Sequence, residues 1–269
     1  MDYRKEYEKW LASPALSEDE RAELRALEGN DKEIKARFYG PLEFGTAGLR
    51  GTMYTGLHNM NRHVIRWATQ GFANVIRAEG TEAMQKGIAV CMDCRNHSAE
   101  FARETACVMA ANGIHVRLFE SLRPTPELSF AVREYGCQAG VNVTASHNPK
   151  EYNGYKVYWA DGAQLPPQHA AAIADELTRI DIFTGVRSMD YEQALAEGRI
   201  ELLGEDCDRR FMANVMGMVN DYETVKKVAD DFGLVYTPFH GCGYKLVPEA
   251  LTRLGIKHLY CEPKQMVID

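Results

Sequence analysis

The sequence of 269 residues has no long apolar run, because its apolar stretches are only a few residues long. A helix that crosses a bilayer needs about 20 consecutive apolar residues, so no membrane partner is expected. The N-terminus alternates charged and apolar residues and has no apolar segment typical of a secretory signal. These two absences predict a cytoplasmic protein.

An excess of positive charge is also missing. Lys and Arg together number 31 and Asp and Glu 38, which gives a net charge of -7. Nucleic acids are bound by clustered positive charge, so this balance argues against nucleic acid as a partner. Low-complexity tracts are absent, and 45% hydrophobic with 26% charged residues is the composition of an ordinary folded protein.

The seven cysteines are an odd number and are scattered through apolar segments, which predicts buried free thiols. Cys91 and Cys94 form one Cys-x-x-Cys pair. A structural zinc site needs four ligands, and redox pairs lie at a helix start, whereas this pair ends a strand-like run. A metal or redox role for the pair is therefore not expected.

The length and the order of elements indicate two α/β units. Residues 1–40 are predicted to form an N-terminal helical extension, 41–203 a first domain and 204–269 part of a second. The predicted helices are 2–11, 17–28, 31–38, 61–78, 98–112, 126–135, 167–180, 208–219 and 244–254. The predicted strands are 87–92, 115–119, 139–144, 155–159, 234–237 and 256–261.

Short strands that alternate with helices predict an α/β fold with a mixed, mostly parallel sheet and crossover helices. The Asn153-Gly154 pair reads as a turn that leads into one antiparallel strand. The polar stretch 181–204 reads as a boundary between the units. Only two strands of the second unit are present, and a two-stranded sheet is not a usual finished domain, so we expect a truncated chain.

The most informative segment runs from Val141 to Pro149, where a buried strand is predicted to enter a small polar loop. Ligands of open α/β sheets collect at the carboxyl ends of strands, where Ser146 would present its hydroxyl group. Pro149 restricts the residue before it to extended conformations. Lys156 would return to this hydroxyl, and a serine beside an ammonium group suits phosphoryl transfer.

Two other interpretations of this loop stay open. Serine, histidine and asparagine before proline are ordinary turn formers, so the loop could be a turn without a function. A serine hydrolase fits less well, because there is no G-x-S-x-G motif and the side chains of the adjacent Ser146 and His147 point in different directions.

A second candidate site is the glycine-rich segment from Phe44 to Gly51. Its glycines let backbone donors approach an anion, and Arg50 offers two parallel hydrogen bonds to phosphate. A plain turn with a surface arginine is the alternative. A third segment, Asp93 to Ser98, places Arg95 after a strand, and Ser98 is expected to cap the helix that follows.

Four motifs together resemble the α-D-phosphohexomutases, the superfamily of phosphoglucomutase and phosphomannomutase. Residues 144–149 with 152–156 resemble the active-serine loop, and 44–51 the N-terminal Gly-Thr-x-Gly-Leu-Arg motif. Residues 93–98 resemble the helix-start motif, and 235–241 the opening of the second domain. The residues of these motifs and the N-terminal helical extension look most like the longer phosphoglucomutase and phosphopentomutase branch.

The resemblance implies a phosphotransferase that interconverts sugar 1-phosphates and 6-phosphates, in the manner of phosphoglucomutase. Ser146 would be the phosphoserine, which donates its phosphoryl group and recovers another from a bisphosphorylated sugar. Lys156 would be the general acid/base or charge stabiliser, with His147 shaping the loop. The residues implied in contacts with phosphate or substrate are Arg50, Arg95, Asn148 and Gly48.

The resemblance also implies Mg²⁺, bound by the phosphate on Ser146 and by three aspartates of an Asp-Gly-Asp-x-Asp-Arg loop, and glucose 1,6-bisphosphate as activator. The sequence contains no Asp-x-Asp-x-Asp. The segment 206–209, Asp-Cys-Asp-Arg, is better explained as an acidic first helical turn. We therefore expect the isolated chain to be incomplete and inactive, with the remaining domains supplied in cis or in trans.

Two alternatives to this function stay open. One is a phosphomannomutase or phosphopentomutase of the same family, because the sugar preference is not readable from these residues. The other is a non-catalytic module that binds phosphorylated sugars with loops of the same shape.

Overall fold

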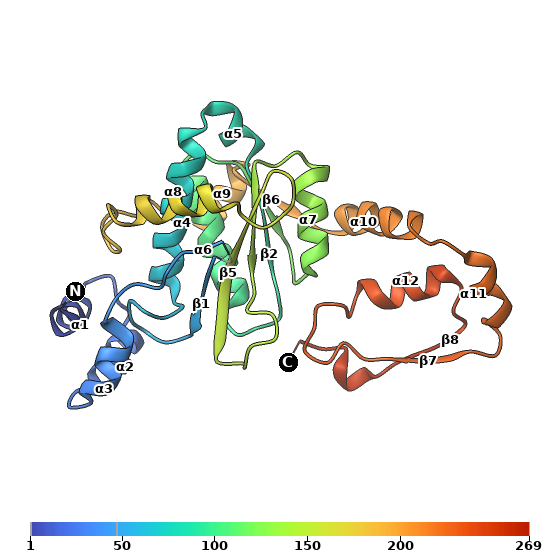
Figure 1. Cartoon of the computed structure of the whole chain (residues 1–269), viewed down its shortest axis with the longest axis horizontal. Coiled ribbons are helices and arrows are strands. Elements are labelled where there is room, and N and C mark those ends of the chain that lie inside the picture. The colour runs from blue at the N-terminus through green and yellow to red at the C-terminus, as the bar shows by residue number, and fades with distance from the viewer. Residues whose placement is uncertain (1, 47, 269) are drawn as a thin grey trace.

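The computed structural model describes residues 2–46 and 48–268 (Figure 1). Its helices are α1 (Tyr3–Ala12), α2 (Glu18–Arg25), α3 (Asp31–Phe38), α4 (Arg62–Ala78), α5 (Thr81–Lys86), α6 (Ser98–Ala111), α7 (Thr125–Glu134), α8 (Pro167–Leu177), α9 (Tyr191–Ala196), α10 (Glu205–Gly217), α11 (Tyr222–Val228) and α12 (Leu246–Leu254). Its strands are β1 (Leu49–Thr52), β2 (Ile88–Met92), β3 (Val116–Phe119), β4 (Ala139–Val143), β5 (Tyr152–Trp159), β6 (Ile200–Leu203), β7 (Gly233–Tyr236) and β8 (His258–Cys261). None of the helices described here is long and apolar enough to span a bilayer.

Six strands form the main sheet in the order β1-β5-β4-β2-β3-β6. Strands β4, β2, β3 and β6 run parallel, and β5 is antiparallel to both of its neighbours, β4 and β1. The residues of β2 and β4 are buried throughout, as expected for strands covered by helices on both faces. The predicted α/β fold with a mixed, mostly parallel sheet is confirmed.

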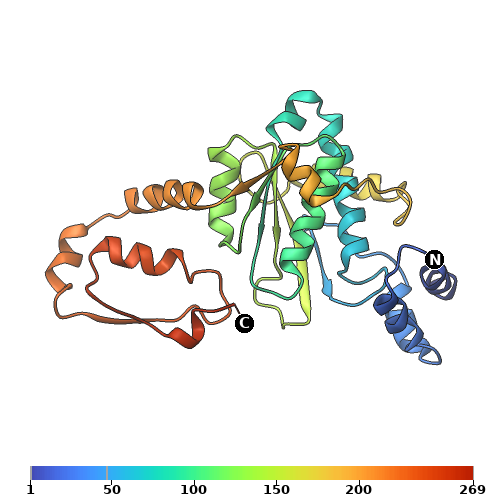
Figure 2. The same ribbon diagram turned by 180° about the vertical axis from the view of Figure 1, so that it is seen from behind.

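Helices cover both faces of this sheet (Figure 2). On one face α4 packs against α6 and α8, and the hydroxyl groups of Thr69 on α4 and Tyr155 on β5 lie 3.0 Å apart. On the other face α7 packs on β2 and β4, where Gly140 leaves room for Val132 and Leu128. Because β2 and β4 are parallel neighbours, the loops that follow them leave the sheet side by side, at the carboxyl ends of the strands.

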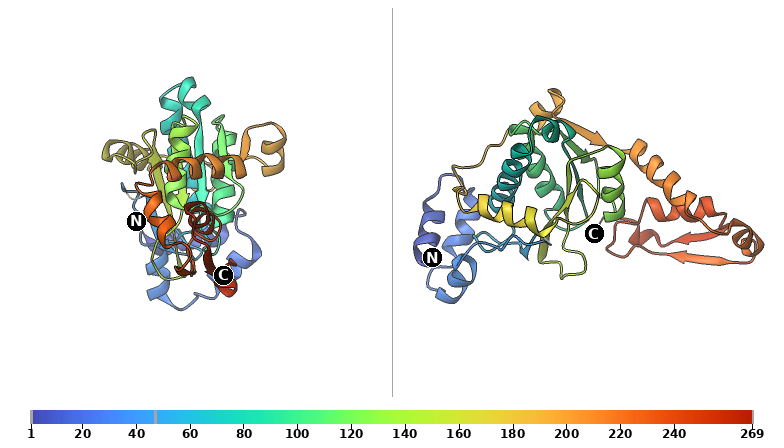
Figure 3. Two further views of the ribbon diagram at one scale, coloured as in Figure 1. Left: turned by 90° about the vertical axis from the view of Figure 1, so that its right-hand side faces the viewer. Right: turned by 45° about the horizontal axis from the view of Figure 1, so that its top comes forward.

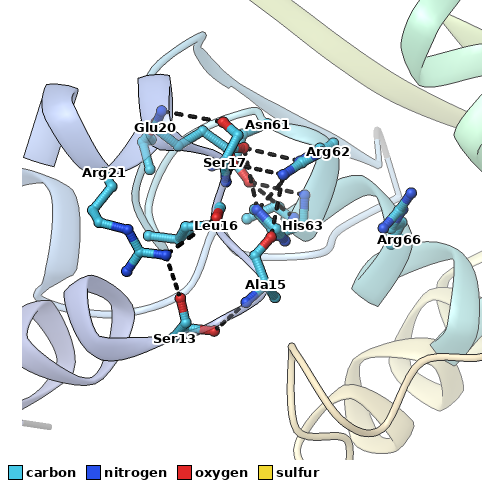
Figure 4. A network of polar contacts seen from close by, with 12 residues as sticks. Ser13, Ala15, Leu16, Ser17, Glu20, Arg21, Asn61, Arg62, His63 and Arg66 are labelled. Carbon is cyan, nitrogen blue, oxygen red and sulfur yellow. Dashed lines mark hydrogen bonds and ion pairs between the residues drawn. The ribbon is translucent and has the colours of Figure 1, made fainter.

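The three N-terminal helices pack on the main core, because Trp10 and Phe38 are fully buried in it. The helix α2 begins with a capping box, in which Ser17 and Glu20 bond each other's backbone N–H groups. Figure 4 shows that Glu20 also faces the start of α4, where it accepts hydrogen bonds from Arg62 and lies 3.2 Å from His63 Nε2. This charge network fastens the N-terminal segment to the first domain.

The second sheet consists of β7 and β8 in parallel, reached through α10 (Figure 3). The two strands carry alternate exposed and half-buried residues, and the directly paired Val235 and Tyr260 are 69% and 54% exposed. Much less apolar surface is buried here than in the first sheet. The predicted limits 1–40, 41–203 and 204–269 stay predictions.

One prediction about local structure was wrong, and some short elements were not predicted. Asn153 and Gly154 lie inside β5 and do not form the turn. Gly154 is needed there because a Cβ atom would approach the carbonyl oxygens of Thr144 and Leu49 to 2.6 and 3.0 Å. The polar stretch 181–204 is no simple linker, since it holds α9 and β6. The end of the glycine-rich segment is strand β1.

Candidate active site

Ser146 lies at the surface in the loop that joins β4 to β5. Its backbone is in the left-handed region with a φ of 59°, which is uncommon for a residue other than glycine. Its N–H group donates to Thr144 Oγ1 at 3.0 Å, and its Oγ lies 3.4 Å from His147 Nδ1. Strained backbone at an exposed hydroxyl is typical of functional sites.

Arg95, in the loop between β2 and α6, fixes the shape of this serine loop. Its Nη1 donates to the carbonyl oxygens of Pro149 and Tyr152 at 2.9 and 3.0 Å. Its Nη2 donates to those of Ser146 and Asn148 at 2.8 and 2.6 Å. Because these donors are engaged with backbone, the structure gives Arg95 a positioning role, and its predicted contact with phosphate stays a prediction.

A second set of hydrogen bonds ties the loop after β2 to β5. Asp93 Oδ1 accepts from Ser98 Oγ at 2.7 Å and from the N–H group of Arg95 at 3.0 Å. Asn153 Nδ2 donates to Ser98 Oγ and to the carbonyl oxygen of Asn96, both at 3.0 Å. The prediction that Ser98 caps α6 was wrong, because the cap position is His97 and the Ser98 hydroxyl bonds Asp93. Distant segments are joined here, a role that spacing alone does not reveal.

Arg50 and Lys156 come from adjacent strands and point to the same face of the sheet. Arg50 pairs with Gly154, and Lys156 lies two residues further along β5, so their side chains share one face. Burial and the charge of Arg50 lower the pKa of Lys156, while Asp93 raises it. The structure thus places two cations on one face of the sheet, Arg50 on β1 and Lys156 on β5, the strand that follows the serine loop.

The other predicted site residues have geometric roles. Gly48 has a φ of 74°, and a Cβ atom there would lie only 1.8 Å from the carbonyl oxygen of Tyr155. Its N–H group already donates to the carbonyl oxygen of Gly45 at 2.8 Å, so this donor is not free to bind phosphate. The contact of Gly48 with phosphate stays a prediction. Asn148 Oδ1 is buried without a hydrogen bond in the part of the chain described. His147 is exposed beside the serine.

Two cavities flank this region. One of about 270 Å³ is lined by Arg50, Thr52 and Tyr152, so it opens directly beside the cation of the glycine-rich segment. Another of about 640 Å³ lies between α1, α8 and the segment before β1, and its walls include Phe44 and Trp67. Ser146 and Lys156 line neither cavity. The smaller one includes Arg50 and Tyr152, and Arg95 binds the carbonyl oxygen of Tyr152 together with that of Ser146, so this cavity lies on the side of the serine loop.

A metal ion does not fit the described residues alone. Among residues 2–46 and 48–268, no group of three or more His, Cys, Asp or Glu side chains is placed to hold an ion. Asp208, from the acidic segment 206–209, instead bonds the buried Arg123. We derive no catalytic step through Mg²⁺.

All seven cysteines are free, and four of them, Cys91, Cys107, Cys137 and Cys207, are buried.

Comparison with known proteins places this geometry in a family. Residues 41–182 match the family described as phosphoglucomutase/phosphomannomutase, alpha/beta/alpha domain I. The chain belongs to this family. It is 32% identical to a phosphoglucomutase of Staphylococcus saprophyticus over 235 residues, which cover 87% of this chain and 41% of that protein. It is 42% identical to a phosphopentomutase of Homo sapiens over 156 residues, 56% of this chain and 26% of that one.

The fold agrees with this membership. The crystal structure of a putative phosphomannomutase from Thermus thermophilus matches with a TM-score of 0.67 at 22% identity, over 85% of this chain and 47% of that one. The chain spans about two fifths of the length of a curated phosphoglucomutase that it matches. The fold and the family are thereby shown, and the reaction of the whole protein remains to be proposed.

Proposed function

We propose that this chain carries the phosphoryl-accepting serine of a sugar-phosphate mutase of the phosphoglucomutase type. The observation that supports it most is the conformation of the serine loop. Arg95 donates hydrogen bonds to four carbonyl groups of the loop in which Ser146 is exposed. A turn without a function would need neither a left-handed serine nor four hydrogen bonds from one half-buried arginine.

The proposed step is transfer between a sugar phosphate and Ser146. The Oγ atom forms a bond to phosphorus while the bond from phosphorus to the sugar oxygen breaks, and that oxygen takes up a proton. The proton of the serine hydroxyl passes to a base, for which Lys156 is the candidate because burial and Arg50 lower its pKa from the ordinary lysine value, and it can be handed on to the leaving sugar oxygen. Arg50 stabilises charge on the phosphoryl oxygens. In the opposite direction, phosphorylated Ser146 gives its phosphoryl group to the free hydroxyl group of a sugar monophosphate. The bisphosphorylated sugar so formed returns its other phosphoryl group to Ser146, which completes the interconversion.

The cofactor and the partners belong to the proposal too. Mg²⁺ would reach the phosphate on Ser146 only with carboxylates from outside the described residues, and glucose 1,6-bisphosphate would supply the first phosphoryl group. The isolated chain is proposed to lack turnover until the remaining domains are present, in cis or in trans.

A pentose phosphate is the second candidate substrate, because a phosphopentomutase has the higher identity of the two relatives described above, over its shorter match. Turnover of glucose 1-phosphate and ribose 1-phosphate would discriminate between the two sugars once the chain is combined with the rest of a mutase.

Intact-mass measurement after incubation with glucose 1,6-bisphosphate tests the proposal. We expect the chain to gain one phosphoryl group and the Ser146→Ala variant to gain none. Ser188→Ala, which removes an exposed serine outside the site, should behave as the parent chain. Saturable binding without added mass would contradict the nucleophile and favour a binding module that retains only the loop shapes.

A further inference from the structure

Four charged residues meet where α7, α10 and the residue before α12 come together. Arg123, Glu127 and Asp208 are only 1%, 0% and 5% exposed. Arg123 holds Asp208 through two hydrogen bonds, from Nε to Oδ1 at 2.6 Å and from Nη2 to Oδ2 at 3.0 Å. Lys245 Nζ, from the second unit, lies 2.6 Å from Asp208 Oδ2. We call these four residues the buried charge cluster.

Glu127 is the unusual member of this cluster. Neither of its carboxyl oxygens has a hydrogen bond within the described residues, and Arg123 Nε is 3.9 Å from its Oε2. A fully buried carboxylate without donors is costly, whereas a protonated carboxyl group can donate to a carboxylate beside it. The same Nε atom contacts Asp208, so the two carboxyl groups are neighbours. Burial and the charge of Asp208 raise the pKa of Glu127 to about 8.

The buried charge cluster is connected to the loop between β2 and α6, which carries Arg95. The N–H group of Arg123 donates to the carbonyl oxygen of Met92, the residue before Asp93. Cys94 Sγ donates to the carbonyl oxygen of His240 at 2.9 Å, so the segment 237–245 of the second unit contacts the loop that carries Arg95. Lys245 ends that segment. The cluster therefore connects the second unit to the residues that shape the serine loop.

We propose that Asp208 and Lys245 are positioning residues, which hold the segment 237–245 beside the serine site, and that a proton shared by Glu127 and Asp208 keeps the cluster closed. This inference rests on the proposed function of Ser146. Loss of the proton places two negative charges side by side in a region where Arg123 is the nearest donor to Glu127. Helix α10 then separates from α7, and the partner of Lys245 moves with it.

Other groups face the cluster and define its charge. Glu120, before α7, lies 3.4 Å from Arg123 Nη2 and is half exposed. Cys207, Cys91 and Tyr135 are the remaining titratable neighbours, and burial raises the pKa of each thiol and of the phenol. All three therefore stay neutral at neutral pH. The ionisation of Glu127 is the change of charge expected in this cluster between about pH 7 and about pH 9.

Hydrogen–deuterium exchange of the whole 269-residue chain tests this inference. At about pH 6 we expect residues 237–245 to be protected, and at about pH 9 to exchange at least about fivefold faster after correction for the intrinsic rate. Glu127→Gln should remove this pH dependence, and Glu192→Gln, at an exposed residue of α9 outside the α7–α10 contact, should not. Protection that does not vary with pH in the parent chain would overturn the shared proton.

Lys245 provides the second arm. Lys245→Met should lose the protection at both pH values, Lys245→Arg should restore it, and Lys227→Met, at an exposed lysine on α11, should change nothing. Circular dichroism checks that each variant is folded. Unchanged exchange in folded Lys245→Met would overturn the positioning role.

Phosphorylation of Ser146 by glucose 1,6-bisphosphate, followed by mass in the same variants, separates the two proposals. Slower phosphorylation in Lys245→Met with rescue by Lys245→Arg supports positioning. Altered exchange with an unaltered phosphorylation rate overturns positioning and leaves the proposed function intact. No phosphorylation of the parent chain overturns the proposed function, while the exchange data still decide whether the cluster opens.

Discussion

At the scale of single residues, the shape of the serine loop depends on a side chain from another loop. Arg95 sits in a loop some fifty residues from the serine in sequence, yet its guanidinium group binds four carbonyl groups of the serine loop. Hydrogen bonds from a charged donor contribute about 1.5–3 kcal/mol each, so the left-handed serine is held firmly. We call these four hydrogen bonds of Arg95 the clamp. The clamp gives the loop the rigidity that the proposed phosphoryl transfer needs.

Replacement of this clamp is the first prediction at this scale. Arg95→Met should slow the phosphorylation of Ser146 by about tenfold or more, because the hydroxyl is no longer held in one place. Arg133→Met, which changes an exposed arginine of α7, should leave the rate unaltered. A time course of intact mass measures both. An unaltered rate in Arg95→Met would show that the loop keeps its shape without the clamp.

The buried carboxyl group of Glu127 gives a prediction about stability. Its pKa is raised to about 8 in the folded chain from a model-peptide value of about 4.3 in the unfolded chain, so the folded chain binds one more proton between these values. The free energy of unfolding should therefore fall as the pH rises through this window. Glu127→Gln should be the more stable form at about pH 8, by urea titration, and should lose this slope.

Sequence patterns predicted the polar loop that follows β4, but they misread several residues around it. Asn153-Gly154 has the composition of a turn, yet the glycine is there so that two carbonyl groups can approach β5. Ser98 has the position of a helix cap, yet its hydroxyl bonds Asp93 and Asn153. The contacts of Ser98 with Asn153 and of Gly154 with Leu49 join residues more than fifty positions apart, and local composition holds no information about them.

At the scale of elements, β4 and β5 carry the serine loop between them, and the N-terminal helices are attached to the same domain through α4. Helix α2 combines a capping box with a charge network on α4, through Glu20 (Figure 4). Hydrogen bonds from His63, Ser17 and Arg62 outweigh the desolvation of the Glu20 carboxylate and hold its pKa well below its usual range. The network is thus charged at neutral pH.

Acid should loosen this network. A lowered pKa in the folded chain means that the stabilisation is present above about pH 4.5 and is lost as the pH falls further. Glu20→Gln should cost about 1–2 kcal/mol at neutral pH and progressively less in acid. Thermal unfolding at several pH values measures the difference. Glu28→Gln, at an exposed residue after the same helix, should show no such dependence.

Helices and strands with strong periodicity were predictable, whereas short edge elements were not. The helix 31–38 was predicted with the bounds that the structure has, and the strands β2 to β4 within one residue. Strands β1 and β6 have only four residues each and lie at the two margins of the sheet, so their formation depends on one neighbouring strand. The sequence therefore predicts the centre of the sheet better than its margins.

At the scale of the whole molecule, the chain combines a fully covered six-stranded sheet with a two-stranded sheet whose paired Val235 and Tyr260 are exposed. The serine site belongs to the first, and the segment 237–245 of the second contacts it through Cys94. The family match of residues 41–182 lies within the part of the chain that forms the first sheet, while sugar preference and the metal ligands were not predictable from this sequence.

The central claim is that the Ser146 hydroxyl accepts a phosphoryl group. Tandem mass spectrometry of the peptide that contains residues 146–152, after exposure to glucose 1,6-bisphosphate, tests it most directly. The account predicts one phosphoryl group on Ser146 and none on other serines or on His147. A phosphoryl group on any other residue, or an unmodified peptide, would contradict it.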